Sequence, residues 1–248
     1  MRILVLRSPD AAPRTAARLA ALGHTPVLLP LARARHDAAA LEAGLAAPHA
    51  AIVLTSAEAA AVLRSRPDLV ERHRDATLFA VGHATAAAAR EAGFRSVTTP
   101  GSDGWTLAGF IDARRPAGLS ADAPLLYLAG FPRSPPFERR LAELDVPHHT
   151  VECYRMEPIA HPPGELERRL SAPRPDAVLF HSRESVRRFF ALPPLAGAPE
   201  RIAGMRLFCI SANVADAVPP DLATAVAIAD APDEESLLAL LAAAPPVE

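Results

Sequence analysis

The chain has 248 residues, 50% of them hydrophobic and 22% charged, and its mean hydropathy is +0.13. This composition excludes a disordered chain, and the length allows one large domain or two small ones. The formal net charge of −2 provides no overall positive field for nucleic acid or an anionic membrane. An anionic ligand would therefore need a local group of arginines.

Short apolar runs alternate along the chain with longer helical patterns. Ile3–Leu6 predicts a buried strand, Pro13–Leu22 a helix that ends at Gly23, and Thr25–Leu29 a second strand. Such alternation of apolar runs with helices predicts an α/β fold with parallel sheets covered on both faces. The same rhythm predicts further strands at Ala51–Leu54, Leu78–Val81, Ser96–Thr98, Leu125–Leu128, Thr150–Cys153, Ala177–Phe180, Leu207–Ile210 and Ala225–Ile228.

Cysteine usage and the first residues indicate the compartment. Cys153 and Cys209 each lie in an apolar strand-like run, which predicts reduced, buried thiols in a cytosolic protein. The first apolar run has four residues, Ile3–Leu6, too few for a signal peptide or a membrane span. We therefore expect a cytoplasmic protein.

Three segments of the chain recur in the same order. Residues 51–58 resemble 177–184 at an offset of 126 (182 minus 56), and 78–82 resemble 207–211 at 129 (211 minus 82). Residues 18–22 resemble 140–144 at 122 (140 minus 18). This internal repeat predicts two similar lobes of about five strands each, which suits a flavodoxin-like doubly wound sheet.

Two serines, Ser56 and Ser182, each follow a predicted strand and precede a predicted helix. One interpretation is a helix N-cap, which serine favours. The other is ligand binding at the carboxyl edge of the sheet, where open α/β folds bind their ligands. Both can hold, whereas the absence of G-x-S-x-G argues against a hydrolase nucleophile.

Further candidate residues lie at predicted strand ends. Gly82 permits a tight strand-to-helix turn, and the amides around His83 and Thr85 there can bind an anion, or the segment is an ordinary turn. Tyr154 follows an apolar strand and either donates a proton or simply packs its ring.

Arginines and histidines complete the set of candidates. Arg7 and Arg183 near strand ends are candidate carboxylate ligands, although most of the 26 basic residues are expected to be solvated surface. The nine histidines have no metal-ligand spacing, so we predict no metal.

These motifs, in this order, resemble the uroporphyrinogen-III synthase family over essentially the whole chain. They are short, and their order and spacing carry the resemblance: residues 4–7, Gly23, Pro30, 54–56, 81–86, Gly93, 151–154, 180–182 and 209–210. The sequence departs from the family pattern at Leu6-Arg7-Ser8, at His181 and at Ser211-Ala212-Asn213-Val214. These departures weaken a catalytic role for positions 6, 211 and 214.

The resemblance implies two flavodoxin-like domains joined by two linker strands, with a cleft between them. Domain 1 is expected at 1–32 and 157–248, domain 2 at 36–152, and the linkers at 33–35 and 153–156. The repeat alone fits a simple split near residue 121 equally well.

The implied reaction is cyclisation of hydroxymethylbilane, with inversion of ring D and loss of water, to give uroporphyrinogen III. The enzyme would mainly hold the floppy substrate in the productive geometry, without metal or organic cofactor. The expected catalytic residues are Tyr154 and Thr85; the expected substrate-binding residues are Arg7, Ser56, Gly82, His83, Ser182, Arg183 and Ser211.

The expected partners are the linear tetrapyrrole and the enzyme that forms it, with no nucleic acid and no membrane, for a monomeric protein. Two other classes remain open. One is a non-enzymatic bilobal sensor that binds a small molecule. The other is a regulator that uses this fold beside a DNA-binding module, and the absence of a basic helix counts against it.

Overall fold

The computed structural model describes residues 1–101, 103–133, 135–171, 173–196 and 198–243. Two compact units divide the chain: unit 1 comprises Met1–Arg33 and Glu157–Glu248, and unit 2 comprises Ala34–Met156. The chain passes from unit 1 to unit 2 within strand β3 (Ala32–His36) and returns within strand β8 (His148–Pro158). The stretches expected as linkers, 33–35 and 153–156, therefore lie within strands, and residue 121 lies inside unit 2.

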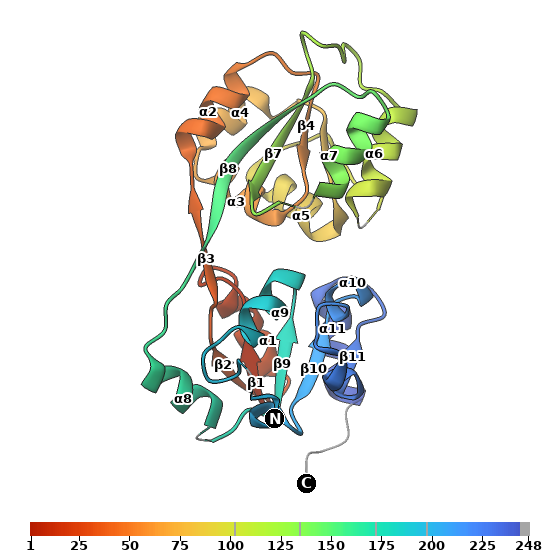
Figure 1. Cartoon of the computed structure of the whole chain (residues 1–248). Coiled ribbons are helices and arrows are strands. Elements are labelled where there is room, and N and C mark those ends of the chain that lie inside the picture. Colours follow the sequence, from red (N-terminus) through yellow and green to blue (C-terminus); the bar gives the residue numbers. More distant parts are fainter. Residues whose placement is uncertain (102, 134, 172, 197, 244–248) are drawn as a thin grey trace. The chain divides into compact units, whose positions relative to one another are not determined.

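Unit 1 is a five-stranded sheet with helices on both faces (Figure 1). Its strands lie in the order β11-β10-β9-β1-β2, and every pair is parallel. Numbered along the unit, this order is 2-1-3-4-5, the flavodoxin order. The elements are β1 (Arg2–Val5), α1 (Ala12–Ala21), β2 (Thr25–Leu28), α8 (Pro163–Ser171), β9 (Ala177–Phe180), α9 (Arg183–Phe190), η1 (Pro199–Ile202), β10 (Arg206–Cys209), α10 (Ala212–Ala215), η2 (Pro220–Ala225), β11 (Val226–Ile228) and α11 (Glu234–Ala243).

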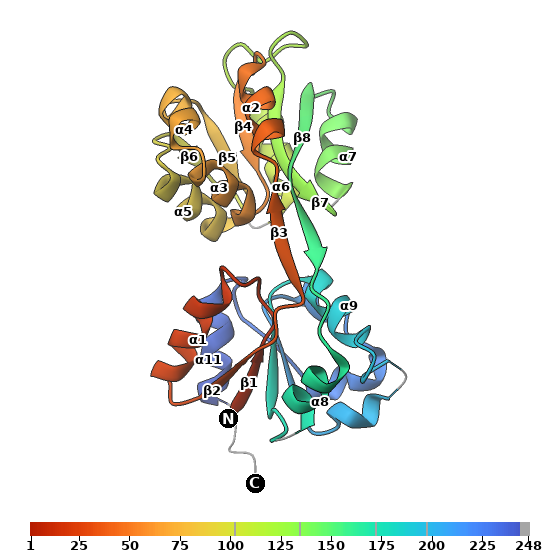
Figure 2. The same cartoon turned by 90° about the vertical axis from the view of Figure 1, so that its left-hand side faces the viewer.

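Unit 2 has a six-stranded sheet in the order β3-β8-β7-β4-β5-β6 (Figure 2). The pairs that join β8, β7, β4, β5 and β6 are parallel, and β3 forms the edge beside β8. Besides β3 and β8, the elements are α2 (Ala38–Ala46), β4 (Ala51–Leu54), α3 (Ala57–Arg64), α4 (Pro67–His73), β5 (Leu78–Ala80), α5 (Gly82–Ala92), β6 (Val97–Thr98), α6 (Gly104–Ala113), β7 (Leu125–Phe131) and α7 (Pro135–Glu143).

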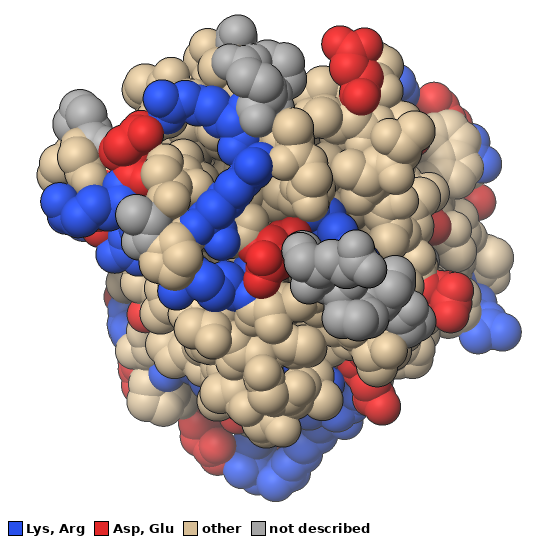
Figure 3. All heavy atoms as spheres, turned by 90° about the horizontal axis from the view of Figure 1, so that it is seen from below, with Lys and Arg blue, Asp and Glu red and all other residues tan. Residues whose placement is uncertain are grey.

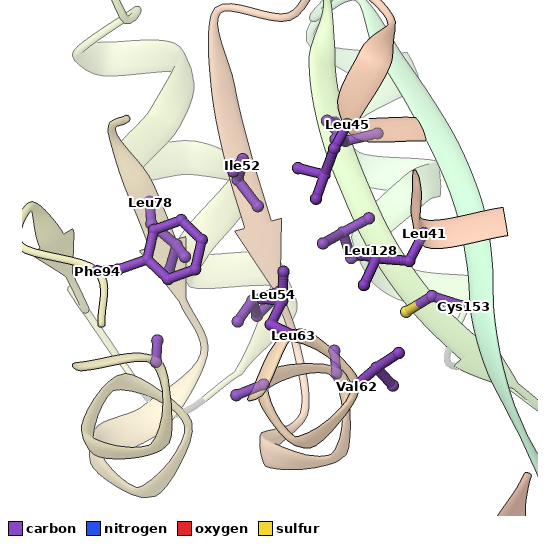
Figure 4. Close-up of a cluster of buried hydrophobic side chains, with 14 of the residues drawn as sticks. Leu41, Leu45, Ile52, Leu54, Val62, Leu63, Leu78, Phe94, Leu128 and Cys153 are labelled. Atoms are coloured by element: carbon purple, nitrogen blue, oxygen red, sulfur yellow. The ribbon is translucent and has the colours of Figure 1, made fainter. Parts of the chain in front are cut away.

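Strand β4 is buried along its whole length, which is why its four residues read as one apolar run. Ile52 and Leu54 face the core cluster under α2, α3, α4 and α5, whereas Ala51 and Val53 face the cluster under α6 and α7. Figure 4 shows the first cluster, in which side chains of the sheet meet those of α2 and α3. In unit 1, α8, α9 and α10 likewise cover one face, and α1 and α11 the other.

The two units have the same spatial plan, and the repeat explains it. Strand order β8-β7-β4-β5-β6 in unit 2 corresponds to β2-β1-β9-β10-β11 in unit 1. The segment from β4 to β6 therefore matches that from β9 to β11, and β7-α7-β8 matches β1-α1-β2. Each unit combines part of the first repeat with part of the second. The two similar α/β lobes predicted from the repeat are confirmed.

Candidate functional site

The carboxyl edge of the unit 2 sheet brings together several predicted residues. Leu54 ends β4 and pairs with Ala80 of β5, so Ser56 and Gly82 follow neighbouring strands at the same edge. Ser56 has extended backbone and caps α3, and its hydroxyl accepts a hydrogen bond from the Glu58 amide at 3.2 Å. The N-cap interpretation of Ser56 is confirmed.

Tyr154 reaches this edge from β8 and is only 9% exposed. Its phenol lies near the side chain of Ser56, 98 residues earlier in the chain (154 minus 56). Burial raises the pKa of Tyr154 to about 12, against the smaller opposing effect of the nearby Ser56 hydroxyl. Tyr154 is thus a neutral phenol at physiological pH, the form that can donate a proton.

Two polar pairs flank Ser56, and the sequence analysis did not identify them. Thr55 Oγ1 lies 2.7 Å from the hydroxyl of Tyr127, which is 1% exposed, and burial raises the pKa of this second phenol. His36 Nε2 lies 2.8 Å from a carboxylate oxygen of Glu58. The rarity of tyrosine was the only sequence signal for Tyr127; His36 had none.

The start of α5 provides backbone donors at the same edge. Gly82 has a φ of +76°, a left-handed conformation that favours glycine, and its amide donates to the Gly101 carbonyl at 2.8 Å. The N-cap residue Val81 makes no side-chain capping bond. The first-turn amides thus have no side-chain cap, as an anion-binding helix start requires. His83 is exposed, and Thr85 is 6% exposed.

In unit 1 the equivalent serine, Ser182, is also an N-cap. It forms a capping box with Ser185 at the start of α9, with the Ser185 amide 3.1 Å from the Ser182 hydroxyl. Arg183 Nη1 donates to Asn213 Oδ1 at 2.9 Å, which directs the guanidinium toward α10. Ser211 caps α10 without a side-chain hydrogen bond. No tyrosine accompanies Ser182 in unit 1, because the chain has only two, and both lie in unit 2.

Arg7 takes part in a largely buried ionic cluster of unit 1. Its Nη1 lies 2.9 Å from Glu234 Oε1, and Arg18 Nη1 lies 3.1 Å from Glu234 Oε2. Thr15, fully buried, donates a hydrogen bond to the same carboxylate. Burial alone would raise the pKa of Glu234, but the hydrogen bond from Thr15 and the charge of Arg7 outweigh it and lower that pKa.

His181 faces this cluster from the end of β9, with Nε2 3.9 Å from Glu234 Oε1. Its Nε2 is buried and has no hydrogen-bond partner among the described residues. Burial, followed by the charge of Arg7, lowers the pKa of His181 to about 3. The imidazole is therefore neutral at physiological pH.

The opposite edge of the unit 1 sheet also carries arginines. Arg2 and Arg206 begin β1 and β10, and the Arg2 amide donates to the Asp176 carboxylate at 2.6 Å. Figure 3 views this side and shows arginine side chains gathered close to acidic ones. Open parallel sheets bind ligands at the carboxyl edge, so these arginines lie at the edge away from the candidate site.

Metal sites, membrane-spanning helices and the state of the cysteines can also be assessed in the structure. Within the described ranges, no cluster of three histidine, cysteine or acidic side chains has metal-binding geometry. None of the helices that the structure describes has the length and apolarity that a membrane crossing requires. Both cysteines are free and buried.

Comparison with known proteins places the chain in a family. No curated protein sequence matches it, but solved structures do, and they show the fold. A mutant uroporphyrinogen III synthase from the extremely thermophilic bacterium Thermus thermophilus has 18% identity and a TM-score of 0.63, with 98% of each chain covered. The uroporphyrinogen-III synthetase of Helicobacter pylori has 16% identity and a TM-score of 0.61, with 98% of this chain and 99% of that chain covered.

A family model decides the assignment. The model described as uroporphyrinogen-III synthase HemD matches residues 13–239, which span both units and every strand except β1. This match agrees with the resemblance carried by the motifs. The chain belongs to the uroporphyrinogen-III synthase family.

Proposed function

We propose that this protein is a uroporphyrinogen-III synthase. It closes hydroxymethylbilane into a ring, inverts ring D and releases water, which makes it a hydro-lyase of tetrapyrrole biosynthesis. The observation that carries the proposal is the family match over residues 13–239. A protonated, largely buried phenol at the carboxyl edge of unit 2 supports it chemically.

In this proposal Tyr154 is the proton donor. The substrate loses the hydroxyl of its terminal hydroxymethyl group, and a proton delivered to that oxygen lets it depart as water. Tyr154 is protonated at physiological pH, as a phenol is at its ordinary pKa of about 10, and burial raises its pKa further, to about 12. The side chain of Ser56 lies beside the phenol, and Thr85 lies in the first turn of the neighbouring α5.

The proposed substrate carries carboxylates, and backbone N–H groups can donate hydrogen bonds to them. We propose that the turn at Gly82 presents the first-turn amides of α5, beginning with that of His83, to a carboxylate in unit 2, since the Gly82 amide itself already donates to the Gly101 carbonyl. Ser182, Arg183 and Ser211 are proposed contacts in unit 1. Arg7 is a weaker candidate, because Glu234 already occupies its guanidinium at 2.9 Å.

The proposed reaction needs no metal or organic cofactor, because loss of water and ring closure are acid-assisted steps without electron transfer. We further propose that the protein works as a cytoplasmic monomer that receives its substrate from the hydroxymethylbilane-forming enzyme. The two buried free thiols are consistent with a reducing compartment.

The test uses freshly made hydroxymethylbilane, oxidation of the products and chromatographic separation of the isomers. Uroporphyrinogen III should form with the wild-type protein. If the uninverted isomer is the sole product, the proposal is refuted. Tyr154→Phe should lower the rate of the inverted product by about a hundredfold, the lower end of the range for general acid catalysis. Tyr127→Phe, the other phenol of the chain, is the matched control and should retain its rate within about twofold. Full activity in Tyr154→Phe would exclude Tyr154 as the acid.

A further inference from the structure

Strand β8 contains an irregularity immediately before Tyr154. Ala129 of β7 pairs with Glu152, but the next residue, Gly130, pairs with Tyr154, so Cys153 is an extra residue in β8. Adjacent residues of a regular strand point to opposite faces of the sheet. Here Cys153 and Tyr154 both belong to the core cluster on the α2–α5 face. The β-bulge has therefore redirected the tyrosine to the face covered by α3, the helix that Ser56 caps.

Gly130 provides the space that the redirected ring occupies. A Cβ atom at this buried position would lie 2.6 Å from the phenol oxygen of Tyr154 and closer still to two carbons of its ring. Among the described glycines, no other would bring a Cβ so close to a neighbouring atom. The obstacle is a ring packed in a core and not the end of a flexible side chain, so any side chain at 130 displaces the phenol.

We infer that Gly130, together with the bulge at Cys153, positions the Tyr154 phenol against Ser56 for the reaction. Gly130 touches no substrate in this inference and acts through Tyr154 alone. The inference rests on the proposed function, because it gives Tyr154 its role as donor. Its rival is that Gly130 serves only the packing of unit 2.

The same substitution made in two backgrounds, with tyrosine or phenylalanine at residue 154, distinguishes a positioning role of Gly130 from a packing role. Gly130→Ala places its methyl group against the ring whether residue 154 is tyrosine or phenylalanine, so the loss of folding stability should be similar in both backgrounds. Only with tyrosine is there a hydroxyl to misplace. Gly130→Ala should therefore lower kcat about tenfold or more in the wild-type background, with less change in KM, and less than about twofold in Tyr154→Phe.

The control for the glycine change is Gly109→Ala in α6, where nothing lies within 4 Å of an added Cβ. This variant should keep the wild-type kcat. If Gly130→Ala keeps kcat, or lowers it by the same factor in both backgrounds, the inference is overturned. If the wild-type and Gly109→Ala proteins themselves form no inverted isomer, the proposed function fails instead.

A readout independent of activity uses 3-fluorotyrosine, since the chain has only two tyrosines. Gly130→Ala should shift the fluorine resonance that is absent in Tyr154→Phe and leave the Tyr127 resonance in place; an unchanged Tyr154 resonance overturns the inference. If Gly130→Ala alone does not fold, Gly130→Ala/Tyr154→Ala should fold, because the ring that the methyl group meets is gone. If Tyr154→Ala folds but the double variant does not, Gly130 is needed for contacts other than that with Tyr154. This outcome also overturns the inference.

Discussion

His181 should make the folded protein sensitive to mild acid. Its side chain is 15% exposed, and burial, with the charge of Arg7, lowers its pKa to about 3. A histidine in the unfolded chain titrates near 6.5. As the pH falls through 6.5, the unfolded state therefore binds a proton that the folded state does not, and stability decreases. The contribution is complete above 6.5 and is lost progressively between 6.5 and 3.

The size of the effect follows from this difference in pKa. A pH of 5 is about 1.5 units below the pKa of an unfolded histidine, and each pH unit corresponds to about 1.36 kcal/mol of unfolding free energy. Wild-type protein should thus lose about 2 kcal/mol between pH 8 and pH 5 through His181 alone. This figure depends little on the folded pKa, provided that the folded imidazole is still neutral at pH 5.

Urea unfolding followed by circular dichroism from pH 8 to pH 5 measures the effect in wild type and His181→Gln. The variant lacks the titrating group, so the difference between the two proteins isolates it from all other groups. His149→Gln, at an exposed histidine of unit 2, is the control and should follow wild type. The opposite sign, with wild type gaining stability toward pH 5 relative to His181→Gln, would show that protonated His181 pairs with Glu234 and would refute the reasoning.

Three further predictions concern the two units. Glu234→Gln should lower the free energy of unfolding by about 1–3 kcal/mol at pH 7 in urea titrations, because it leaves a guanidinium without its carboxylate; its effect should vanish in acid, as pH falls through the lowered pKa of that carboxyl. Cys153 and Cys209, buried and with pKa values raised to about 12, should not react with a thiol-specific chromogenic reagent until urea unfolds the chain. Ser56→Ala and Ser182→Ala should each cost about 1 kcal/mol as lost helix caps. In the isomer assay Ser56→Ala should lower kcat, whereas Ser182→Ala, at a proposed substrate contact, should act on KM; equal effects on kcat would contradict the assignment of the acid to unit 2.

The sequence was sufficient to predict the architecture because buried parallel strands leave a strong local signal. Ala51–Leu54 and Ala177–Phe180 were predicted within their observed bounds, since each is a continuous apolar run. The repeat also revealed which elements are equivalent. The repeat alone could not reveal whether β1-α1-β2 or its copy β7-α7-β8 completes the sheet of β4–β6. The two copies are alike, and only their tertiary contacts distinguish them. The composition of the units was therefore expected from the family resemblance, which implies 1–32 with 157–248, and not from the repeat.

The candidate site was only partly predictable, for a related reason. Ser56 was found because a serine between a strand and a helix is a local pattern. Its contact with Tyr154 depends on one extra residue in β8 and on the missing side chain of Gly130. Neither leaves a pattern in a single sequence. Arg7 was proposed for substrate carboxylates, and its own carboxylate partner, Glu234, lies 227 residues away (234 minus 7) and was equally hidden.

The two units are equivalent in fold but differ in the chemistry of their carboxyl edges. Both sheets end in a serine that caps the next helix, but the surroundings of the two edges differ. In unit 1 the chain supplies its own carboxylate, Glu234, to Arg7 and Arg18, so the positive charge there is already partly neutralised. In unit 2 the edge has a neutral phenol, Tyr154, and helix amides without a side-chain cap. An anionic substrate gains more where donors are unsatisfied than where it must displace a bound carboxylate, so unit 2 is the side on which proton donation should occur.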